Sequence, residues 1–362
     1  MRSKILVNAR FTTQRLTGVQ RYAAEVLRRL PIMTLLSPSE PDLVYRSVTD
    51  RHHLVVKTAQ IGKLRIQGHL WEQLVLPRLV TRGAWLWSPG GSGPLLVTKQ
   101  VVTVHDLSPL EHPEWYDWKY AQFYRWLLPR LLNRVPFVIT VSEFTKACVL
   151  DRFKLLPDQV IVTPLGVDKR FTPLPLENIR EVLLRYGLET PYFIAVSSIS
   201  RRKNLKRVIE GWKIANLHGI KLVIVGAKGL AFAGKSEVPL DSSVKYIGYV
   251  PDEDLPALYA GALGALYLSL YEGFGLPALE AMACGTPLLA SDVTSLPEVV
   301  GDAGLLVDPY DIEAIAYGIR RIAEDHTLRE KLRRKGLERA KLFTWERTAE
   351  VTWVSFQERG LI

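Results

Sequence analysis

Cysteine is scarce in this chain, with only Cys148 and Cys284 among 362 residues. Small secreted domains depend on several disulfides, so a disulfide framework is excluded and a reducing cytosol fits the composition. Long apolar runs are also missing, because none approaches the ~18 residues that a membrane-spanning helix needs. The first apolar stretch ends at Asn8, which is too soon for a signal peptide. We therefore expect a cytoplasmic protein with neither a disulfide scaffold nor a transmembrane segment.

Acidic side chains are scarce in the first half of the chain. Residues 1–170 hold 24 Lys and Arg but 13 Asp and Glu, a net charge of +11. Residues 171–362 hold 23 Lys and Arg and 24 Asp and Glu, a net charge of −1. A strongly basic half is typical of proteins that meet phosphate-rich partners, either anionic lipid headgroups or nucleic acid. General solubility is the other explanation, and charge alone does not decide between them.

The apolar runs that are present are short, and helical patterns separate them. In the first half the strand-like runs are Lys4–Asn8, Leu54–Val56, Trp85–Trp87, Val101–Val104 and Phe137–Val141. In the second half they are Tyr192–Val196, Lys221–Val225, Val244–Ile247, Ala265–Leu268 and Pro287–Ala290. This alternation predicts parallel, doubly wound sheets. We expect an α/β protein of two Rossmann-like domains, joined near residues 168–176.

The stretch from Glu272 to Pro287 carries the strongest functional signal. It places Glu272 on a Gly-rich turn after a strand and starts a helix near Pro277, a favoured first helical residue. We expect Glu280 on the first turn of this helix, and the helix to end at Gly285. Two carboxylates then bracket a helix N-terminus, whose free N–H groups bind phosphate. The arrangement suits a nucleotide sugar, with one carboxylate at the sugar and the other at the ribose.

Further motifs follow in order along almost the full chain. They are Gly18 with Arg21-Tyr22, Trp71-Glu72-Gln73 with Leu76-Pro77, Thr103-Val104-His105-Asp106-Leu107, His112-Pro113-Glu114-Trp115, Val141-Ser142-Glu143-Phe144, Arg202-Lys203-Asn204-Leu205, Gly248-Tyr249-Val250, Leu296-Pro297-Glu298-Val299 and Phe343-Thr344-Trp345. With the two glutamates, this set resembles retaining glycosyltransferase family 4, which has the GT-B fold of two facing Rossmann-like domains with an interdomain cleft. The Trp-Glu-Gln and Arg-Lys-Asn-Leu elements are most similar to the bacterial glycan mannosyltransferases of that family.

The resemblance implies a division of labour between the two halves. Residues 1–170 would form an N-terminal acceptor domain and residues 171–344 a C-terminal nucleotide-sugar domain. The final helix, at about 345–362, would pack back on the first domain.

The resemblance also implies site roles. Glu272 would contact sugar hydroxyls, and His105 would contact the transferred sugar. The expected catalytic residues are His105, Asp106 and Glu272. Arg202 and Lys203 follow a strand at its carboxyl end and can neutralise a diphosphate, although a solvated basic face is the alternative. Many family members carry Gly-Arg where Ser197-Ser198 stands here, so the positive charge at the phosphates would come from Arg202, Lys203 and Lys228. The other implied donor contacts are Gly18, Tyr249, Val250, the N–H groups of Phe274, Gly275 and Leu276, and the ribose carboxylate Glu280.

Several of these features have simpler explanations. Gly18 is accounted for by turn chemistry alone, His105 by capping in a loop, and the two glutamates by the helix dipole. Asp252-Glu253-Asp254 has the spacing of a metal motif, but it precedes a helix start where acids are favoured, so no metal is implied. Residues 115–126 hold seven aromatic side chains interleaved with Lys and Arg. This pattern is typical of a helix packed on a core, of a surface that contacts a membrane or the acceptor, and of a site for single-stranded nucleic acid.

These observations predict a retaining glycosyltransferase that needs no metal or other cofactor. The expected donor is GDP-mannose, and the expected acceptor is a polyprenyl-diphosphate-linked glycan for a surface polysaccharide such as lipopolysaccharide. The basic half would lie on the anionic inner face of the cytoplasmic membrane, and we expect no nucleic-acid partner. Other GDP- or UDP-sugars (rhamnose, glucose, GlcNAc) and a catalytically silent glycan- or membrane-binding protein are the alternatives. A nicotinamide oxidoreductase is disfavoured, because no Gly-x-Gly-x-x-Gly opens either half.

Overall fold

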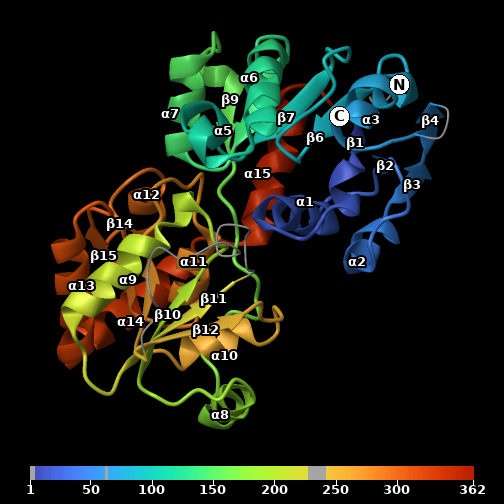
Figure 1. Ribbon diagram of the computed structural model, residues 1–362. Helices are drawn as coiled ribbons and strands as arrows, with labels where there is room; N and C mark the ends of the chain where they lie inside the picture. The colour runs from blue at the N-terminus through green and yellow to red at the C-terminus, as the bar shows by residue number, and fades with distance from the viewer. Residues whose placement is uncertain (1–4, 62–63, 227–241) are drawn as a thin grey trace. The chain divides into compact units, whose positions relative to one another are not determined.

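The computed structural model describes residues 5–61, 64–226 and 242–362, which divide into two compact units (Figure 1). The first unit contains Met1–Gly166 together with Trp345–Ile362, and the second contains Val167–Thr344. Each unit is built around its own parallel sheet with helices on it, so both are Rossmann-like α/β domains.

The sheet of the first unit contains seven parallel strands in the described part of the chain, in the order β3-β2-β1-β6-β7-β8-β9. The strands are β1 (Ile5–Asn8), β2 (Thr34–Ser37), β3 (His53–Val56), β6 (Trp85–Ser88), β7 (Gln100–Val104), β8 (Phe137–Thr140) and β9 (Val160–Val162). A separate antiparallel hairpin joins β4 (Ala59–Ile61) to β5 (Leu64–Ile66). Most strands are buried on both faces, which explains their continuous apolar runs.

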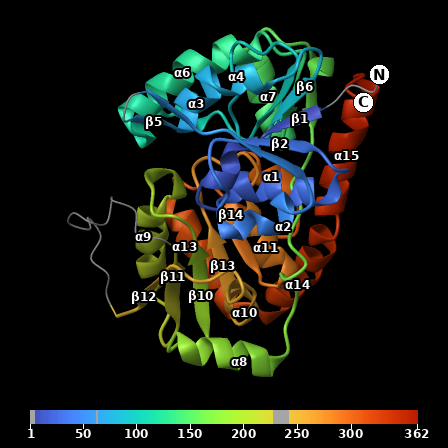
Figure 2. The same cartoon turned by 90° about the vertical axis from the view of Figure 1, so that its right-hand side faces the viewer.

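The helices of the first unit include one from the end of the chain. They are α1 (Gly18–Arg29), α2 (Arg46–Thr49), α3 (Gly68–Leu74), α4 (Leu76–Leu79), α5 (Ser108–Glu111), α6 (Trp118–Leu132), α7 (Glu143–Arg152) and α15 (Trp345–Glu358). Helix α15, red in Figures 1 and 2, packs beside α1. Its Phe356 ring lies 5.6 Å from that of Trp87, and its Thr348 hydroxyl donates to the Pro164 carbonyl at 2.6 Å. The last helix is therefore part of the first unit's core.

The second unit repeats the plan with six parallel strands among the described residues, in the order β12-β11-β10-β13-β14-β15. These are β10 (Tyr192–Val196), β11 (Lys221–Val225), β12 (Val244–Gly248), β13 (Gly264–Tyr267), β14 (Leu288–Ser291) and β15 (Leu305–Val307). The helices are α8 (Leu176–Arg185), α9 (Leu205–Ala215), α10 (Leu255–Ala260), α11 (Leu276–Ala283), α12 (Leu296–Val300), α13 (Ile312–Glu324) and α14 (His326–Ala340). The strand order reverses between β10 and β13, and ligands bind at such a switch point in open α/β sheets.

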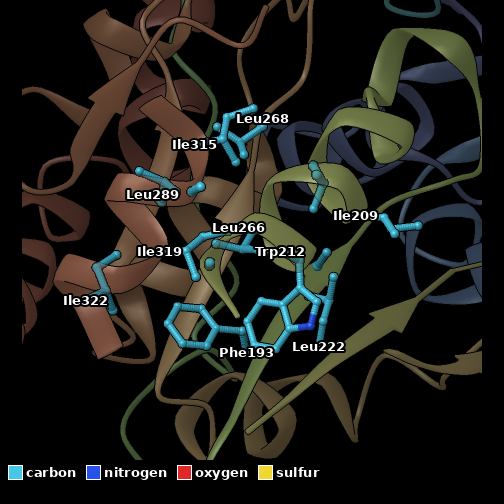
Figure 3. Close-up of a cluster of buried hydrophobic side chains, with 14 of the residues drawn as sticks. Phe193, Ile209, Trp212, Leu222, Leu266, Leu268, Leu289, Ile315, Ile319 and Ile322 are labelled. Atoms are coloured by element: carbon cyan, nitrogen blue, oxygen red, sulfur yellow. The ribbon is translucent and has the colours of Figure 1, made fainter. Parts of the chain in front are cut away.

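The largest aromatic side chains of the second unit anchor its core. Figure 3 shows Phe193 and Trp212 among Leu222, Leu266 and Ile319, all of them buried. The two aromatic rings lie 5.5 Å apart, and the indole N–H donates to the Ser243 hydroxyl at 3.1 Å. Each such apolar side chain contributes roughly 1.5–3 kcal/mol by leaving water. The core thus fixes β10 and β13, the two strands that flank the switch point.

None of the helices in the part of the chain that the structure describes is both long enough and apolar enough to span a bilayer.

Candidate active site

Two cations and one carboxylate meet at the switch point of the second unit. Arg202 and Lys203 lie on a 3-10 turn (Arg201–Lys203) after β10, and Glu272 follows β13. Arg202 Nη1 donates to Glu272 Oε2 at 2.9 Å, and Lys203 Nζ donates to Oε1 at 2.5 Å. The Leu270 N–H also donates to the Arg202 carbonyl at 2.8 Å, so backbone as well as side chains joins the two loops. The strand order brings together groups that lie about 70 residues apart in the sequence.

The ion pairs keep Glu272 ionised. Its side chain is almost fully buried, and burial raises the pKa of Glu272, but the charges of Arg202 and Lys203 outweigh burial and lower this pKa to about 2. Lys203 also donates to the Tyr267 hydroxyl at 2.8 Å, and its ammonium lies 4.8 Å from the centre of that ring. Both carboxylate oxygens of Glu272 are thus engaged with cations.

Neighbouring hydroxyl groups fix the loop that carries Glu272. The Glu272 N–H donates to Thr294 Oγ1 at 3.2 Å, while Ser295 Oγ lies 2.9 Å from the Glu272 carbonyl and 3.0 Å from the Phe274 carbonyl, both of which can accept its hydrogen bond. Sequence reasoning missed Thr294 and Ser295 as well as Tyr267. The available signal was their position, since the two hydroxyl residues directly precede the Leu-Pro-Glu-Val motif.

The start of helix α11 requires a glycine. Gly275 has φ +108°, which side chains rarely adopt, and an added Cβ would lie 2.6 Å from Leu296 Cδ2. Phe274 is buried, and its ring lies 5.7 Å from that of Phe343, while Leu276 opens the helix. The tight turn lets the first backbone N–H groups of α11 follow directly on Glu272.

Glu280 lies one turn later than expected. Because α11 begins at Leu276, Glu280 is on the second turn, and the expectation of a first-turn position is wrong. A second turn is too far along for its carboxylate to cap the helix start. The side chain is 8% exposed. The helix does end as expected, with Gly285 at φ +74°.

The remaining predicted contacts of the second unit are dispersed over loops. Tyr249 is 63% exposed and Val250 is buried, both in the loop after β12. Lys228 lies outside the described residues. Asp254, from the acidic triplet, directly precedes α10, and its carboxylate accepts from Arg185 at the end of α8 at 2.9 Å and from the hydroxyl of the next residue, Tyr186, at 2.7 Å. These contacts connect the start of α10 with the end of α8, so Asp254 has a structural role.

The other predicted residues belong to the first unit. His105 follows β7, and its Nε2 donates to the Pro89 carbonyl at 2.8 Å. Burial lowers the pKa of His105 from 6.5, so the ring is neutral and its Nδ1 is an acceptor. Asp106 Oδ1 accepts from the Ser108 N–H at 2.9 Å and from its hydroxyl at 2.5 Å, and it thereby holds the first residue of α5. Gly18 is the first residue of α1, so its expected place in the preceding turn is wrong.

Comparisons with known proteins agree with this division into two units. A model described as Glycosyltransferase Family 4 matches residues 16–171, and one described as Glycosyl transferases group 1 matches residues 178–339. The chain is 31% identical to O-antigen chain mannosyltransferase B of Escherichia coli over 365 residues, which cover 91% of this chain and 93% of that protein. This chain belongs to the group 1/family 4 glycosyltransferases.

The glycosyltransferase has further relatives at lower coverage. It is 28% identical over 271 residues to the serotype-specific mannosyltransferase WbdA of E. coli, and the match spans 71% of this chain but only 33% of WbdA. It is 30% identical over 291 residues to the MMP alpha-(1->4)-mannosyltransferase of Mycolicibacterium hassiacum, which covers 74% of this chain and 68% of that protein.

Solved structures show that the glycosyltransferase has the GT-B fold. Sucrose-phosphate synthase from Thermosynechococcus elongatus matches with a TM-score of 0.77 and 20% identity, over 99% of both chains. Anabaena HepE, in complex with UDP and glucose, matches with a TM-score of 0.76 and 17% identity, over 98% of this chain and 100% of that one. The predicted fold class and family are therefore confirmed.

Proposed function

We propose that this glycosyltransferase transfers mannose from GDP-mannose to a growing glycan with retention at the anomeric carbon. The observation that carries the proposal is the buried contact of Arg202 and Lys203 with Glu272 at the switch point of the second unit. Cations suit a diphosphate, and a carboxylate suits sugar hydroxyls. Mannose as the sugar rests on relatives that are named mannosyltransferases.

The proposed donor site needs no metal. During transfer the bond from the anomeric carbon to the phosphate oxygen breaks, and negative charge develops on the departing nucleoside diphosphate. Arg202 and Lys203 would stabilise that charge, with the N–H groups that open α11 as further donors. Glu280 would bind the ribose, and the loop of Tyr249 and Val250 would contact the base. Activity that survives exhaustive EDTA treatment would support this assignment, and loss that Mg²⁺ restores would contradict it.

The state of Glu272 favours one of two routes to retention. A double displacement needs a free carboxylate beneath the anomeric carbon. Both oxygens of Glu272 are engaged with cations, and its low pKa makes it a weak nucleophile. We therefore favour same-face attack, in which the acceptor oxygen bonds to the anomeric carbon while its proton passes to the departing phosphate. The Nδ1 atom of His105, an acceptor in the neutral ring, would contact a hydroxyl of the transferred sugar.

Helix α6 supports a membrane-linked acceptor. Two tryptophan side chains of this helix are exposed: Trp118 by 67% and Trp126 by 45%. The Lys119 ammonium lies 5.9 Å from the Trp118 ring centre, and the Arg130 guanidinium lies 5.2 Å from that of Trp126. Amphipathic aromatics beside cations suit the lipid headgroup region. We propose that this surface meets the anionic inner face of the cytoplasmic membrane, where a polyprenyl-diphosphate-linked acceptor for a surface polysaccharide would lie.

A second donor class has a specific observation in its favour. The structural neighbour HepE is described in complex with UDP-glucose, and the fold is shared over nearly the full chain. A UDP-sugar is therefore the alternative donor. A catalytically silent glycan- or membrane-binding protein is disfavoured, because such a protein needs no pairing of two cations with one buried carboxylate.

A thermal-shift screen tests the donor assignment. GDP, UDP and their sugars are compared at equal concentration, and a ligand at 100 times its Kd adds about 2.7 kcal/mol of stability. We expect GDP and GDP-mannose to give the largest shifts. Arg202→Gln should weaken GDP binding about tenfold or more, because it removes a charge-assisted contact. The matched control is Arg201→Gln, which changes an exposed neighbour.

The outcomes separate the proposals. No shift with any nucleoside diphosphate would refute a donor site, and larger shifts with UDP would replace GDP. Binding without transfer of any sugar to a membrane extract would favour the silent protein. An anomeric configuration opposite to that of the donor, measured by NMR of the product, would refute retention.

A further inference from the structure

A second polar cluster lies at the switch point of the first unit. Its centre is Glu72 of α3, whose side chain is fully buried. Glu72 accepts hydrogen bonds from Asn8 Nδ2 at 2.7 Å, Arg10 Nε at 3.2 Å, Ser92 Oγ at 2.8 Å and His69 Nδ1 at 3.1 Å. Ser92 Oγ in turn accepts from Arg10 Nη2 at 3.0 Å. We call these five residues the Glu72 cluster.

The sheet order places this cluster where a ligand is expected. Strand β1 pairs with β2 on one side and with β6 on the other, so the strand order reverses between β1 and β6. Asn8 ends β1 and Arg10 follows it, while Ser92 lies in the loop after β6. The cluster therefore stands at the carboxyl ends of the two strands, the usual binding position in open α/β sheets.

Charge balance in the cluster selects the kind of ligand. Burial raises the pKa of Glu72, but the charge of Arg10 and the interactions with His69 and Asn8 lower this pKa to about 2. The ionised carboxylate compensates Arg10, whose side chain is only 8% exposed. Because the charge of Arg10 is already paired with that of Glu72, the cluster offers a ligand chiefly hydrogen bonds. A neutral polar ligand fits better.

Two nitrogen atoms remain available to such a ligand. An ionised carboxylate only accepts, so His69 Nδ1 carries a proton, and Nε2 of the same ring is the nitrogen left to exchange a hydrogen bond with a ligand hydroxyl. Among the described residues, neither His69 Nε2 nor Arg10 Nη1 has a partner, and the His69 side chain is 26% exposed. Two nitrogen atoms at one edge match the hydroxyl groups of a sugar, because a hydroxyl group can both donate and accept a hydrogen bond.

A row of aromatic rings adjoins the cluster, and it consists of Tyr116 and three residues of α6. The His69 ring lies 4.5 Å from that of Phe123 and 5.6 Å from that of Tyr124. Tyr124 stands 4.6 Å from Tyr120, which stands 5.5 Å from Tyr116. Rings at this spacing pack against the C–H faces of pyranoses, since both surfaces are apolar and rigid. The 41% exposure of Tyr120 leaves part of the row accessible.

The row also connects the cluster with the corner of His105. The Tyr116 hydroxyl lies 2.5 Å from Ser108 Oγ, which donates to Asp106. On the other side, Gly91 lies in the loop that carries Ser92, and an added Cβ there would lie 3.9 Å from the His105 ring. The cluster, the row and His105 therefore share one edge of the first unit's sheet.

We propose that the Glu72 cluster and the row of aromatic rings beside it form a carbohydrate subsite that binds a pyranose of the acceptor. His69 Nε2 and Arg10 Nη1 hydrogen-bond its hydroxyls, and Tyr120 packs on its apolar face. Glu72 is a positioning residue, because it fixes the orientation and the protonated nitrogen of His69. The subsite rests on the proposed function in one respect, namely that the acceptor is a glycan.

The test uses α-(1→3)-mannobiose and inorganic pyrophosphate as probes of the full chain. With 15N-histidine labelling, mannobiose should shift the imidazole signals of His69, which are assigned by their loss in His69→Ala. Loss of a neutral hydrogen bond should raise the mannobiose Kd about three- to tenfold in His69→Ala. Tyr120→Leu, which leaves the imidazole in place, should also raise it. The matched control is His53→Ala, at an exposed position on an edge strand, which should bind as wild type.

The outcomes are decisive for the subsite. No saturable binding of mannobiose to the wild type, wild-type affinity in both variants, or His69 shifts with pyrophosphate alone would overturn it. Circular dichroism of each variant checks that the fold is intact. GDP binding in the thermal-shift screen is scored separately. A protein that binds GDP but not mannobiose would lose this subsite and keep its donor site, whereas the reverse would refute the donor site alone.

Discussion

Replacing Glu272 by glutamine removes the negative charge that pairs with Arg202 and Lys203 in the second unit. Gln keeps the shape of the side chain but cannot compensate Arg202 and Lys203. The pKa of Glu272 falls from 4.5 to about 2 in the folded protein. At ~1.4 kcal/mol per unit, this difference corresponds to about 3 kcal/mol of stability at neutral pH. Because the folded pKa is depressed, the contribution is complete above pH 4.5 and is lost as the pH falls towards 2.

Urea denaturation followed by circular dichroism measures this loss. At pH 7 we expect Glu272→Gln to lower the free energy of unfolding by about 3 kcal/mol, and the difference from wild type to shrink as the pH approaches 3. The matched control is Glu330→Gln, an exposed carboxylate of α14, which should change stability by less than about 0.5 kcal/mol. The variant should still bind GDP at least as tightly as wild type, since the two cations lose their internal partner, while sugar transfer should fall.

One result would refute the reasoning directly. If Glu272→Gln and Glu330→Gln lose the same small amount of stability at pH 7, the buried pairs do not stabilise the domain. A loss that is constant from pH 7 to pH 3 would show that packing, and not charge, is responsible.

Three further predictions concern other parts of the molecule. Burial lowers the pKa of His105 from 6.5, so below pH 6.5 the unfolded chain binds a proton that the folded protein does not, and stability falls. His105→Gln should make the urea midpoint less dependent on pH in this range. The same pH dependence in wild type and variant would contradict this prediction. Gly226→Ala would place a Cβ 1.8 Å from the Ser197 carbonyl, so the backbone must move at a cost of more than about 3 kcal/mol, and a wild-type melting temperature would disprove this. Replacing Trp118 and Trp126 together by serine should weaken binding to anionic vesicles about tenfold or more; unchanged co-sedimentation would exclude this helix as the membrane contact.

The sheets were largely predictable from continuous apolar runs. The runs Tyr192–Val196 and Lys221–Val225 have the same bounds as β10 and β11. Strands β2, β9 and β15, of three or four residues each, were missed. Such short segments carry no period, and they become strands only through pairing with a neighbour. A strand's place in the sheet did not decide the outcome, since the edge strands β3 and β12 were predicted and the interior strand β2 was not.

The site was predictable in its residue types but not in its pairings. Arg202 and Glu272 were both singled out, yet nothing in their spacing shows that they form an ion pair, because that contact depends on the strand order. The sequence analysis also did not predict that Asp106 accepts hydrogen bonds from Ser108 at the start of α5. These hydrogen bonds compete with a role of Asp106 at a substrate. The aromatic segment 115–126 also resisted prediction: Tyr124 is buried while Trp118 and Trp126 are exposed, so core and surface functions share one helix.

The path of the chain has a consequence for synthesis on the ribosome. The first unit takes its last helix, α15, from the final residues of the chain, and the whole second unit is inserted before it. A nascent chain that has just completed β9 therefore lacks the helix whose Phe356 packs on Trp87. The second unit can fold while the first unit still exposes the apolar surface of α1 that α15 later covers. Synthesis of α15, and not the end of the first 166 residues, is then the step at which the first unit becomes complete and resistant to proteolysis.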